Sequence, residues 1–154
     1  MTKNNLIDFA KFVGPIKTID IHGKPYVTVP ERLRAFHNLY HNGRIVTELI
    51  HGEGGHYIMK ATVTPEVENP DRYFTGYAHE DESKSQINKT SAIENCETSA
   101  IGRALGVKGI ITEYGIASAD EVRNAIEQEK VMNIVTDAAK KKVAEEKPTD
   151  TGGE

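Results

Sequence analysis

A chain of 154 residues, with 38% hydrophobic and 27% charged residues, has the size and composition of one globular domain with tails. One cysteine, Cys96, excludes an intramolecular disulfide and fits a reducing compartment such as the cytoplasm. The net charge of −4 counts against ordinary nucleic-acid binding, so any such contact has to come from a local group of cations. No segment approaches the ~20 apolar residues of a membrane helix, and no signal-peptide pattern opens the chain.

The first 40 residues predict a short helix, a hairpin and a second helix. Residues 6–13 place apolar side chains at helical spacing, and Gly14-Pro15 ends that helix. Two short apolar runs flank a turn at residues 22–25, which predicts two paired strands. Pro30 then suits the first turn of a helix that runs to about Tyr40, because apolar residues recur there every three or four positions.

Three strands and a long helix follow. The strands are predicted at residues 44–51, 57–67 and 72–79, and their short connections imply an antiparallel meander. The helix is predicted from Lys89 to Val107, with a stripe of alanine, serine and glycine along one side. Such small residues permit a close approach to a sheet or to another helix.

The last predicted element is a helix from Ala119 to about residue 142. Ser118 and Glu121 have the spacing of a capping box at its start, and three lysines near its end suit the helix dipole. Residues 148–154 are expected to be a disordered polar tail. We expect one α+β domain over residues 1–130, and the end of the helix with the tail over residues 131–154.

No group of residues has the pattern of a catalytic or metal site. His37 and His41 share a helix face but lack further ligands, and Cys96 lies on the small-residue stripe as a buried thiol would. The glycine turn at residues 52–55 lacks the lysine and the helix of a phosphate-binding loop. The sequence therefore predicts a protein that is not an enzyme and that has no metal and no cofactor.

Cations and aromatic residues are the remaining candidates for function. Lysines and arginines neutralise phosphates, and aromatic rings stack on unpaired bases. Scattered charges more often form a solvated surface, and strand aromatics more often pack in a core. The cations are Lys84, Lys89, Arg103 and Lys108 around the long helix, with Lys17, Lys24, Arg32, Arg34 and Arg44 before it. The aromatic residues are Tyr57, Tyr73, Phe74 and Tyr77.

One segment of the long helix resembles a known family. Thr98-Ser99-Ala100, Arg103-Ala104-Leu105 and Gly109-Ile110 are similar to the pattern of single-strand annealing proteins of the Rad-fifty-two and Erf superfamily. Residues 33–47 and 116–122 also resemble segments of phage-encoded members, so the resemblance covers roughly residues 24–126. It implies a β-β-β-α core in which the long helix is packed across the antiparallel meander, followed by the C-terminal helix.

The resemblance also implies a site. In that family single-stranded DNA follows a basic groove between the sheet hairpins and the helix-bearing body, and the arginine of the Arg-Ala-Leu motif contacts the phosphate backbone. Gly102 and Gly106 stand where the family often has basic residues, so other cations would have to replace them. The predicted DNA-binding residues are Arg103, Lys24, Lys89, Lys84, Lys108 and Arg44.

The expected function is binding and annealing of single-stranded DNA in phage-type recombination, replication or repair, by an oligomer without catalysis. Its partners would be single-stranded DNA, further copies of the chain in a ring or filament, and phage or host replication and recombination proteins. It would act in the cytoplasm, that of the host if the chain is phage-encoded. The alternative is an assembly or inhibitor module of the same fold that binds protein and no DNA. A separate possibility is that Arg103 has only a structural role, in a salt bridge to Glu97 or Glu113.

Overall fold

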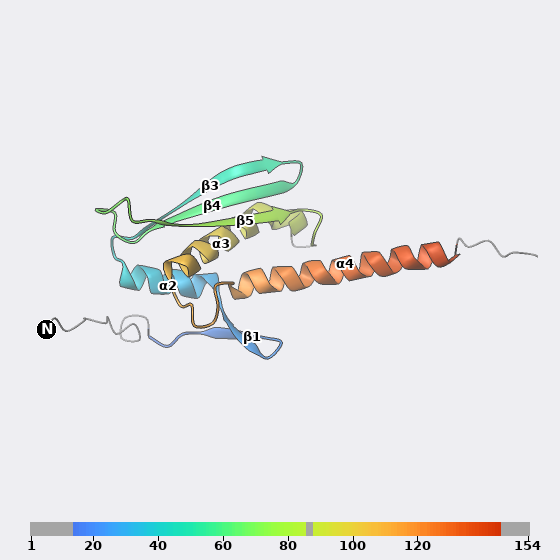
Figure 1. Ribbon diagram of the computed structural model, residues 1–154, viewed down its shortest axis with the longest axis horizontal. Helices are drawn as coiled ribbons and strands as arrows, with labels where there is room; N and C mark the ends of the chain where they lie inside the picture. The colour runs from blue at the N-terminus through green and yellow to red at the C-terminus, as the bar shows by residue number, and fades with distance from the viewer. Residues whose placement is uncertain (1–13, 86–87, 146–154) are drawn as a thin grey trace, which may run out of the picture.

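The computed structural model describes residues 14–85 and 88–145 (Figure 1). The helix predicted at residues 6–13 and the tail predicted at residues 148–154 lie outside these ranges. The described elements are β1 (Thr18–Ile21), β2 (Lys24–Val27), α2 (Val29–Leu39), β3 (Arg44–Glu53), β4 (His56–Thr64), β5 (Phe74–Asp81), α3 (Asn88–Lys108) and α4 (Ala119–Glu145).

The N-terminal hairpin and α2 form where the local sequence predicts them. β1 pairs antiparallel with β2, and the turn between them contains Gly23 at a φ of 79°, which glycine adopts at no steric cost. Thr28 caps α2, since its hydroxyl accepts from the Glu31 N–H at 3.4 Å, and Pro30 occupies the first turn. The hairpin therefore leads directly into α2.

A second, three-stranded sheet has the order β3-β4-β5, with both pairs antiparallel. The ladder between β3 and β4 shifts register between Leu49 and His51, as at a β-bulge. β4 ends at Thr64, three residues before the predicted end, because Pro65 has no N–H to continue the ladder. The meander predicted from the short connections is confirmed.

Helix α3 packs across one face of this sheet, which confirms the predicted α+β fold. It contacts all three strands, and the side chains of Met59, Ala61 and Val63 are buried in the same core as Cys96 and other α3 residues. The side chains that alternate with them on β4 point to the opposite face. In Figure 1 the helices and the hairpin all lie on one side of the sheet.

The small residues of α3 explain how closely the helix approaches the sheet. A Cβ atom added at Gly76 of β5 would lie 2.3 Å from the Ala104 nitrogen and 2.6 Å from the Ala100 oxygen. Larger residues on either element would hold the two backbones apart. The stripe predicted from the sequence is therefore a packing surface for the sheet.

Helix α4 begins at the predicted capping box and runs past the body of the molecule (Figure 1). The Ser118 N–H donates to Glu121 Oε2 at 2.8 Å, and the Glu121 N–H donates to Ser118 Oγ at 3.2 Å. The boundary expected at residues 130–131 falls inside this continuous helix. Within the described part of the chain, no helix combines the length and apolar content needed to span a membrane.

Candidate nucleic-acid interface

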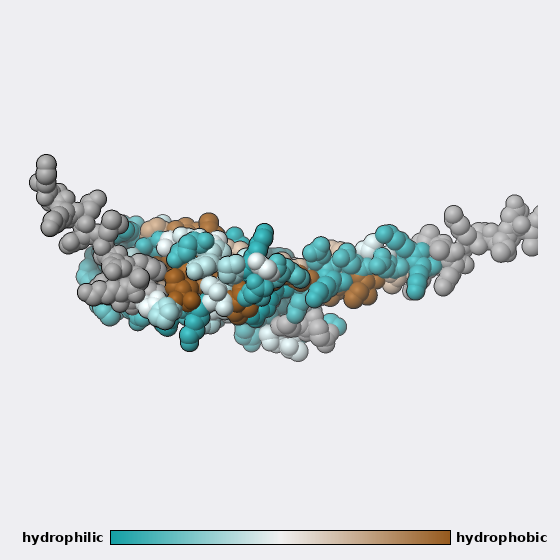
Figure 2. Space-filling model, turned by 90° about the horizontal axis from the view of Figure 1, so that it is seen from below, coloured by the Kyte–Doolittle hydropathy of each residue, from teal (hydrophilic) through white to brown (hydrophobic). Residues whose placement is uncertain are grey.

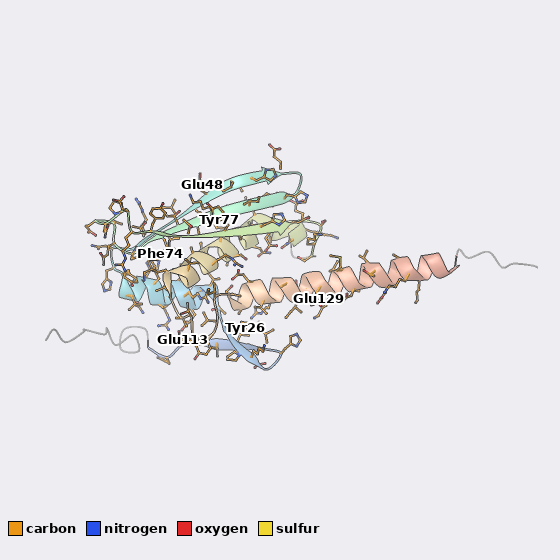
Figure 3. All side chains as sticks on the ribbon, in the orientation of Figure 1. Tyr26, Glu48, Phe74, Tyr77, Glu113 and Glu129 are labelled. Atoms are coloured by element: carbon orange, nitrogen blue, oxygen red, sulfur yellow. The ribbon has the colours of Figure 1, made fainter. Side chains whose placement is uncertain are left out.

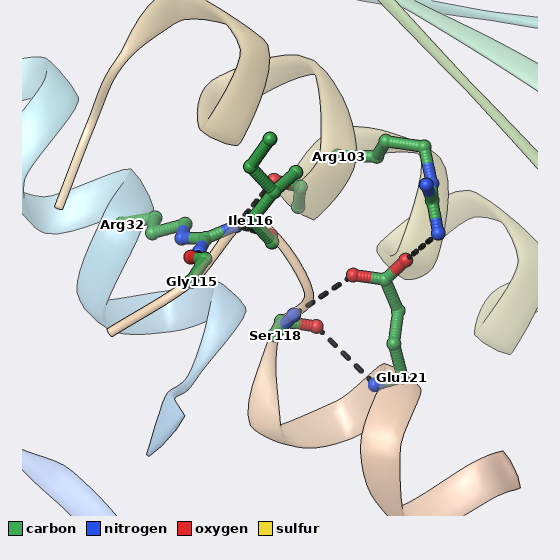
Figure 4. A network of polar contacts seen from close by, with 7 residues as sticks. Arg32, Arg103, Gly115, Ile116, Ser118 and Glu121 are labelled. Carbon is green, nitrogen blue, oxygen red and sulfur yellow. Dashed lines mark hydrogen bonds and ion pairs between the residues drawn. The ribbon is translucent and has the colours of Figure 1, made fainter. Parts of the chain in front are cut away.

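Arg103 projects from α3 toward the first turn of α4. Its Nη2 atom donates to Glu121 Oε1 at 2.5 Å, and 48% of its side-chain surface stays exposed whereas only 12% of the Glu121 side chain does (Figure 4). The ion-pair partner is Glu121 and not Glu97 or Glu113, the two expected if Arg103 had only a structural role. The guanidinium still presents part of its surface to a ligand.

Glu121 is held in place by the backbone as well as by Arg103. Its second carboxylate oxygen accepts from the Ser118 N–H in the capping box described above. One carboxylate therefore caps α4 and orients Arg103 at the same time. This fixed geometry keeps the arginine at a defined position on the surface.

A cleft of about 240 Å³ opens beside Arg103. Consecutive residues of β5, an edge strand of the sheet, form one wall, and α3 and the start of α4 form the other. The lining residues are Tyr77, Ala78, His79, Glu80, Ser99, Arg103, Glu121 and Ala125. Arg103 lies in the cleft, and Tyr77 and His79 belong to the β5 wall while their side chains alternate toward the opposite sheet face. Arginine, aromatic rings and imidazoles are groups that contact phosphates and bases.

The sheet face opposite α3 continues outward from this cleft. Tyr77 lies there with 53% of its surface exposed, directly across the ladder from Lys60, and Lys60 lies across from Glu48 (Figure 3). The Lys60 Nζ atom is 3.9 Å from the Glu48 carboxylate. His79 and Val46 are also exposed on β5 and β3. We call this surface, from Val46 to His79 across the three strands, the open sheet face.

The six predicted DNA-binding residues do not gather in one groove. Lys84 and Lys89 lie at the N-terminal end of α3, whereas Lys108 ends the same helix about 28 Å away at 1.5 Å per residue. Arg44 begins β3, and Lys24 belongs to the separate hairpin. Their roles in binding stay predictions, but a single continuous groove lined by all six is wrong for this fold.

Lys108 is occupied by aromatic contacts. Its Nζ atom donates to the Tyr40 hydroxyl at 2.9 Å and lies 4.8 Å from the Tyr40 ring centre and 5.4 Å from that of Phe74. The side chain is half-buried. Cation–π contacts of this kind stabilise the fold locally, and they reduce the surface that Lys108 can offer to a phosphate.

Carboxylates surround the cations at the N-terminal end of α3. Glu80, Asp81 and Glu82 precede Lys84 in the turn, and Asn88 donates to Glu80 Oε2 at 2.6 Å. Hydrogen bonds from the Ser83 hydroxyl and backbone hold the pKa of Asp81 below its ordinary value. The turn therefore remains anionic at neutral pH, which opposes phosphate binding by Lys84 and Lys89.

Two arginines grouped with the candidate cations have structural roles. Arg32 is fully buried, and its guanidinium donates to the carbonyl oxygens of Gly102, Gly115 and Ile116 at 2.9, 2.6 and 2.5 Å (Figure 4). Arg34 donates to Glu31 at 2.5 Å. Neither belongs to an open cationic surface.

Lys60 and His79 are site candidates that the sequence reasoning missed. The alternation of buried Met59, Ala61 and Val63 along β4 was the available signal, because it turns Lys60 toward the opposite face. His79 follows Tyr77 by two residues and therefore shares its face. Glu121 was recognised as a helix cap, but its pairing with Arg103 depends on the position of α4.

The described residues show no arrangement of three or more histidine, cysteine, aspartate or glutamate side chains that could hold a metal ion. Cys96 is fully buried, and its Sγ lies 3.4 Å from the carbonyl oxygens of Tyr57 and Ala78. Burial raises the pKa of this thiol, which disfavours the reactive thiolate. Cys96 is thus part of the α3–sheet core.

Comparison with known proteins gives one similarity. Residues 33–108 match the family described as Slr1353 N-terminal dsRNA-binding domain-like. The matched segment contains most of α2, the whole β3-β4-β5 sheet and α3, just under half of the 154-residue chain. No curated protein and no solved structure matches. The similarity is to a nucleic-acid-binding class of domain, which agrees with the coarse functional prediction.

The resemblance to the Rad-fifty-two and Erf superfamily is wrong, because the matching family is the dsRNA-binding-like one. Ala100, Ala104 and Leu105, which carried part of the resemblance, are fully buried in the core. The two departures from the pattern also pack closely, since a Cβ atom at Gly102 would lie 2.6 Å from Val29, and one at Gly106 would lie 2.9 Å from the Arg32 guanidinium. Close packing of this helix therefore produced a pattern that resembled a family motif.

Proposed function

We propose that the protein binds single-stranded nucleic acid along the open sheet face and the adjacent Arg103 cleft. The observation that carries the proposal is that half-exposed Arg103 lies in a cleft against β5, the strand that exposes Tyr77 and His79 on the adjoining open sheet face. The match to a dsRNA-binding-like family supports nucleic acid as the ligand class.

Each group in this site has a defined task in the proposal. Arg103 pairs with a backbone phosphate and shares its guanidinium between that phosphate and Glu121. The Tyr77 ring stacks on an unpaired base, which any base allows because all have a flat π face. Lys60 exchanges its long contact with Glu48 for a second phosphate. Binding is therefore independent of base sequence.

The same geometry supports annealing of complementary strands as the activity. Contacts to phosphates and to one base face leave the Watson–Crick edges free to pair with a second strand. Few cations per copy make each contact weak, and two associated copies multiply such contacts. We propose that annealing proceeds without catalysis by any residue of the chain.

The test is fluorescence-anisotropy binding of labelled oligonucleotides of one length as single-stranded DNA, single-stranded RNA, duplex DNA and duplex RNA at low salt. We expect single strands to bind, and Arg103→Gln and Tyr77→Ala each to weaken binding about tenfold. The matched control is Arg123→Gln on α4, beside the hairpin and outside the Arg103 cleft. Absence of salt-sensitive binding, or unchanged affinity of both site variants, would remove the proposal.

Duplex RNA is the second candidate, because the matching family is described by that ligand. Domains of this kind read the shape of a duplex through phosphates and 2′-hydroxyls and need no base stacking. Tighter binding of duplex RNA than of single strands, with no effect of Tyr77→Ala, would favour it. If none of the four oligonucleotides binds, the protein-binding alternative replaces both nucleic-acid proposals.

A further inference from the structure

Helix α4 leaves the body of the molecule as a protruding arm. Every residue from Glu129 to Lys141 is exposed, although Val131, Met132 and Val135 lie beside Ser83 and Lys84 of the β5–α3 turn (Figure 1). A single helix of this length is marginally stable in water without tertiary contacts. Within the described residues, the exposed side chains of the arm have few of the contacts that normally stabilise such a helix.

The arm carries an apolar stripe. Val131, Ile134, Val135 and Ala138 recur at intervals of three and four residues, with Met132 beside them, and thus share one side of the helix. Ile134 is 69% exposed, Val135 61% and Met132 58%. Figure 2 shows hydrophobic surface on the protruding helix among polar residues. This stripe has the spacing of a helix–helix contact.

The charges along the arm are arranged in opposite order on the two sides of Ile134. Glu127 precedes it by seven residues and Lys141 follows it by seven, so both lie on the side of the helix that carries Ile134. Closer to the centre the signs reverse, with Lys130 before Ile134 and Asp137 after it on the same side. Rotation by 180° about an axis near Ile134 therefore places Glu127 near Lys141 and Lys130 near Asp137.

We infer that a second copy of this chain packs on the stripe, so that two α4 helices pair antiparallel about a twofold axis near Ile134. The paired stripes bury Val131, Ile134, Val135 and Ala138 of both copies. Glu127 of each copy then faces Lys141 of the other, and Lys130 faces Asp137. A parallel pair would instead place like charges together, which is destabilising.

The contact is isologous and closes with two copies, unlike the ring or filament expected from the sequence. It leaves the open sheet face and the Arg103 cleft of each copy unobstructed by the stripe, because those lie on the body. The inference does not depend on nucleic-acid binding. A pair of this kind would also supply the two associated copies that annealing requires.

The first experiment is sedimentation velocity on the full-length chain over a wide concentration range, without nucleic acid. We expect a reversible monomer–dimer equilibrium. Ile134→Gln should weaken the dimer at least tenfold and leave the fold intact, because Ile134 is already 69% exposed in the monomer. The matched control is Asn133→Gln, one residue away on the other side of the helix, which should leave the equilibrium unchanged.

Charge reversal tests the antiparallel arrangement. The variant Glu127→Lys and the variant Lys141→Glu should each dimerise about tenfold more weakly. An equimolar mixture of the two should form a heterodimer, and the double variant should recover the original affinity. Loss in each single variant with rescue in the double variant is specific to the antiparallel pair, since a parallel pair keeps like charges together in every variant.

A chain that stays monomeric at its highest soluble concentration would overturn the inference. A dimer that is insensitive to Ile134→Gln and to both charge reversals would also overturn it, because another surface would then form the contact. Circular dichroism of each variant as a monomer should show the native helix content. If Ile134→Gln lost helix content together with dimerisation, the charge-reversal variants would decide between the two outcomes.

Discussion

Arg32 shows how a single buried cation can connect three segments of the chain. It extends from α2 to backbone carbonyls of α3 and of the loop that precedes α4. These carbonyls carry partial negative charges at the ends of backbone dipoles and replace the water that burial removes. Burial lowers the pKa of the guanidinium, and the negative charges of Glu121 and Glu113 act in the opposite direction. The arginine therefore fixes α2 against the α3–α4 connection.

Replacement of Arg32 by methionine should lower the free energy of unfolding by about 3 kcal/mol. Methionine preserves most of the side-chain volume but leaves the three carbonyl oxygens without their donor. Urea denaturation followed by circular dichroism measures the change. Arg72→Met is the control, because Arg72 is exposed before β5, and it should change stability by less than about 0.5 kcal/mol. Equal effects of the two substitutions would contradict the structural role of Arg32.

Among the glycines in the described part of the chain, Gly76 marks the closest approach of two elements, β5 and α3. Gly76 on the strand and Ala100 and Ala104 on the helix have almost no side chain between the two backbones. Because the contact is backbone against backbone, neither element can relieve a clash by changing a rotamer. The distance between α3 and the sheet thus depends on Gly76.

Gly76→Ala should destabilise the protein by about 3 kcal/mol, at the upper end of the usual cost of overpacking. The added methyl group must push the helix away from β5 and open the core around Ala100 and Ala104. Thr75→Ala, on the opposite face of the same strand, is the matched control and should cost less than about 1 kcal/mol. A thermal-unfolding midpoint for Gly76→Ala equal to that of the control would show that the helix adjusts freely.

At the scale of the whole molecule, charge is spread in separate groups over an acidic protein. The sequence segment of the family match contains eight lysines and arginines and ten aspartates and glutamates, so it has no excess of positive charge. Cations at the two ends of α3 and on the hairpin lie too far apart to act on one short stretch of ligand. Lys60 lies on the open sheet face where Tyr77 and His79 are exposed, Arg103 lies in the adjacent cleft, and Arg44 shares that face at the start of β3.

The salt dependence of binding should therefore be shallow. If two or three phosphates are neutralised per copy, log K should fall with log salt concentration with a slope of about −2 for a single strand. Anisotropy titrations at several salt concentrations from low to physiological ionic strength measure this slope. Arg103→Gln should reduce its magnitude by about 0.7, and Arg123→Gln should not change it. A slope steeper than about −5 would show that the distant cations also contact the ligand.

The sequence by itself determined the order and type of the described elements. Apolar and aromatic runs separated by short turns predicted the meander, apolar and small residues at helical spacing predicted α2 and α3, and Ser118 with Glu121 predicted the start of α4. These features depend on interactions within a few residues along the chain, so local pattern is sufficient. The small-residue stripe also predicted a close helix contact, although its resemblance to an annealing-protein motif assigned the wrong family.

Only the tertiary structure decided the roles of individual charges. Arg32 and Arg103 both lie on predicted helices, yet one is buried among carbonyl oxygens and the other is half-exposed beside a carboxylate. The difference arises because residues 70 to 84 positions away supply the Arg32 acceptors, and a residue 18 positions away supplies the Arg103 partner. Which groups meet over such separations depends on how the helices pack on the sheet, and no local pattern encodes that arrangement.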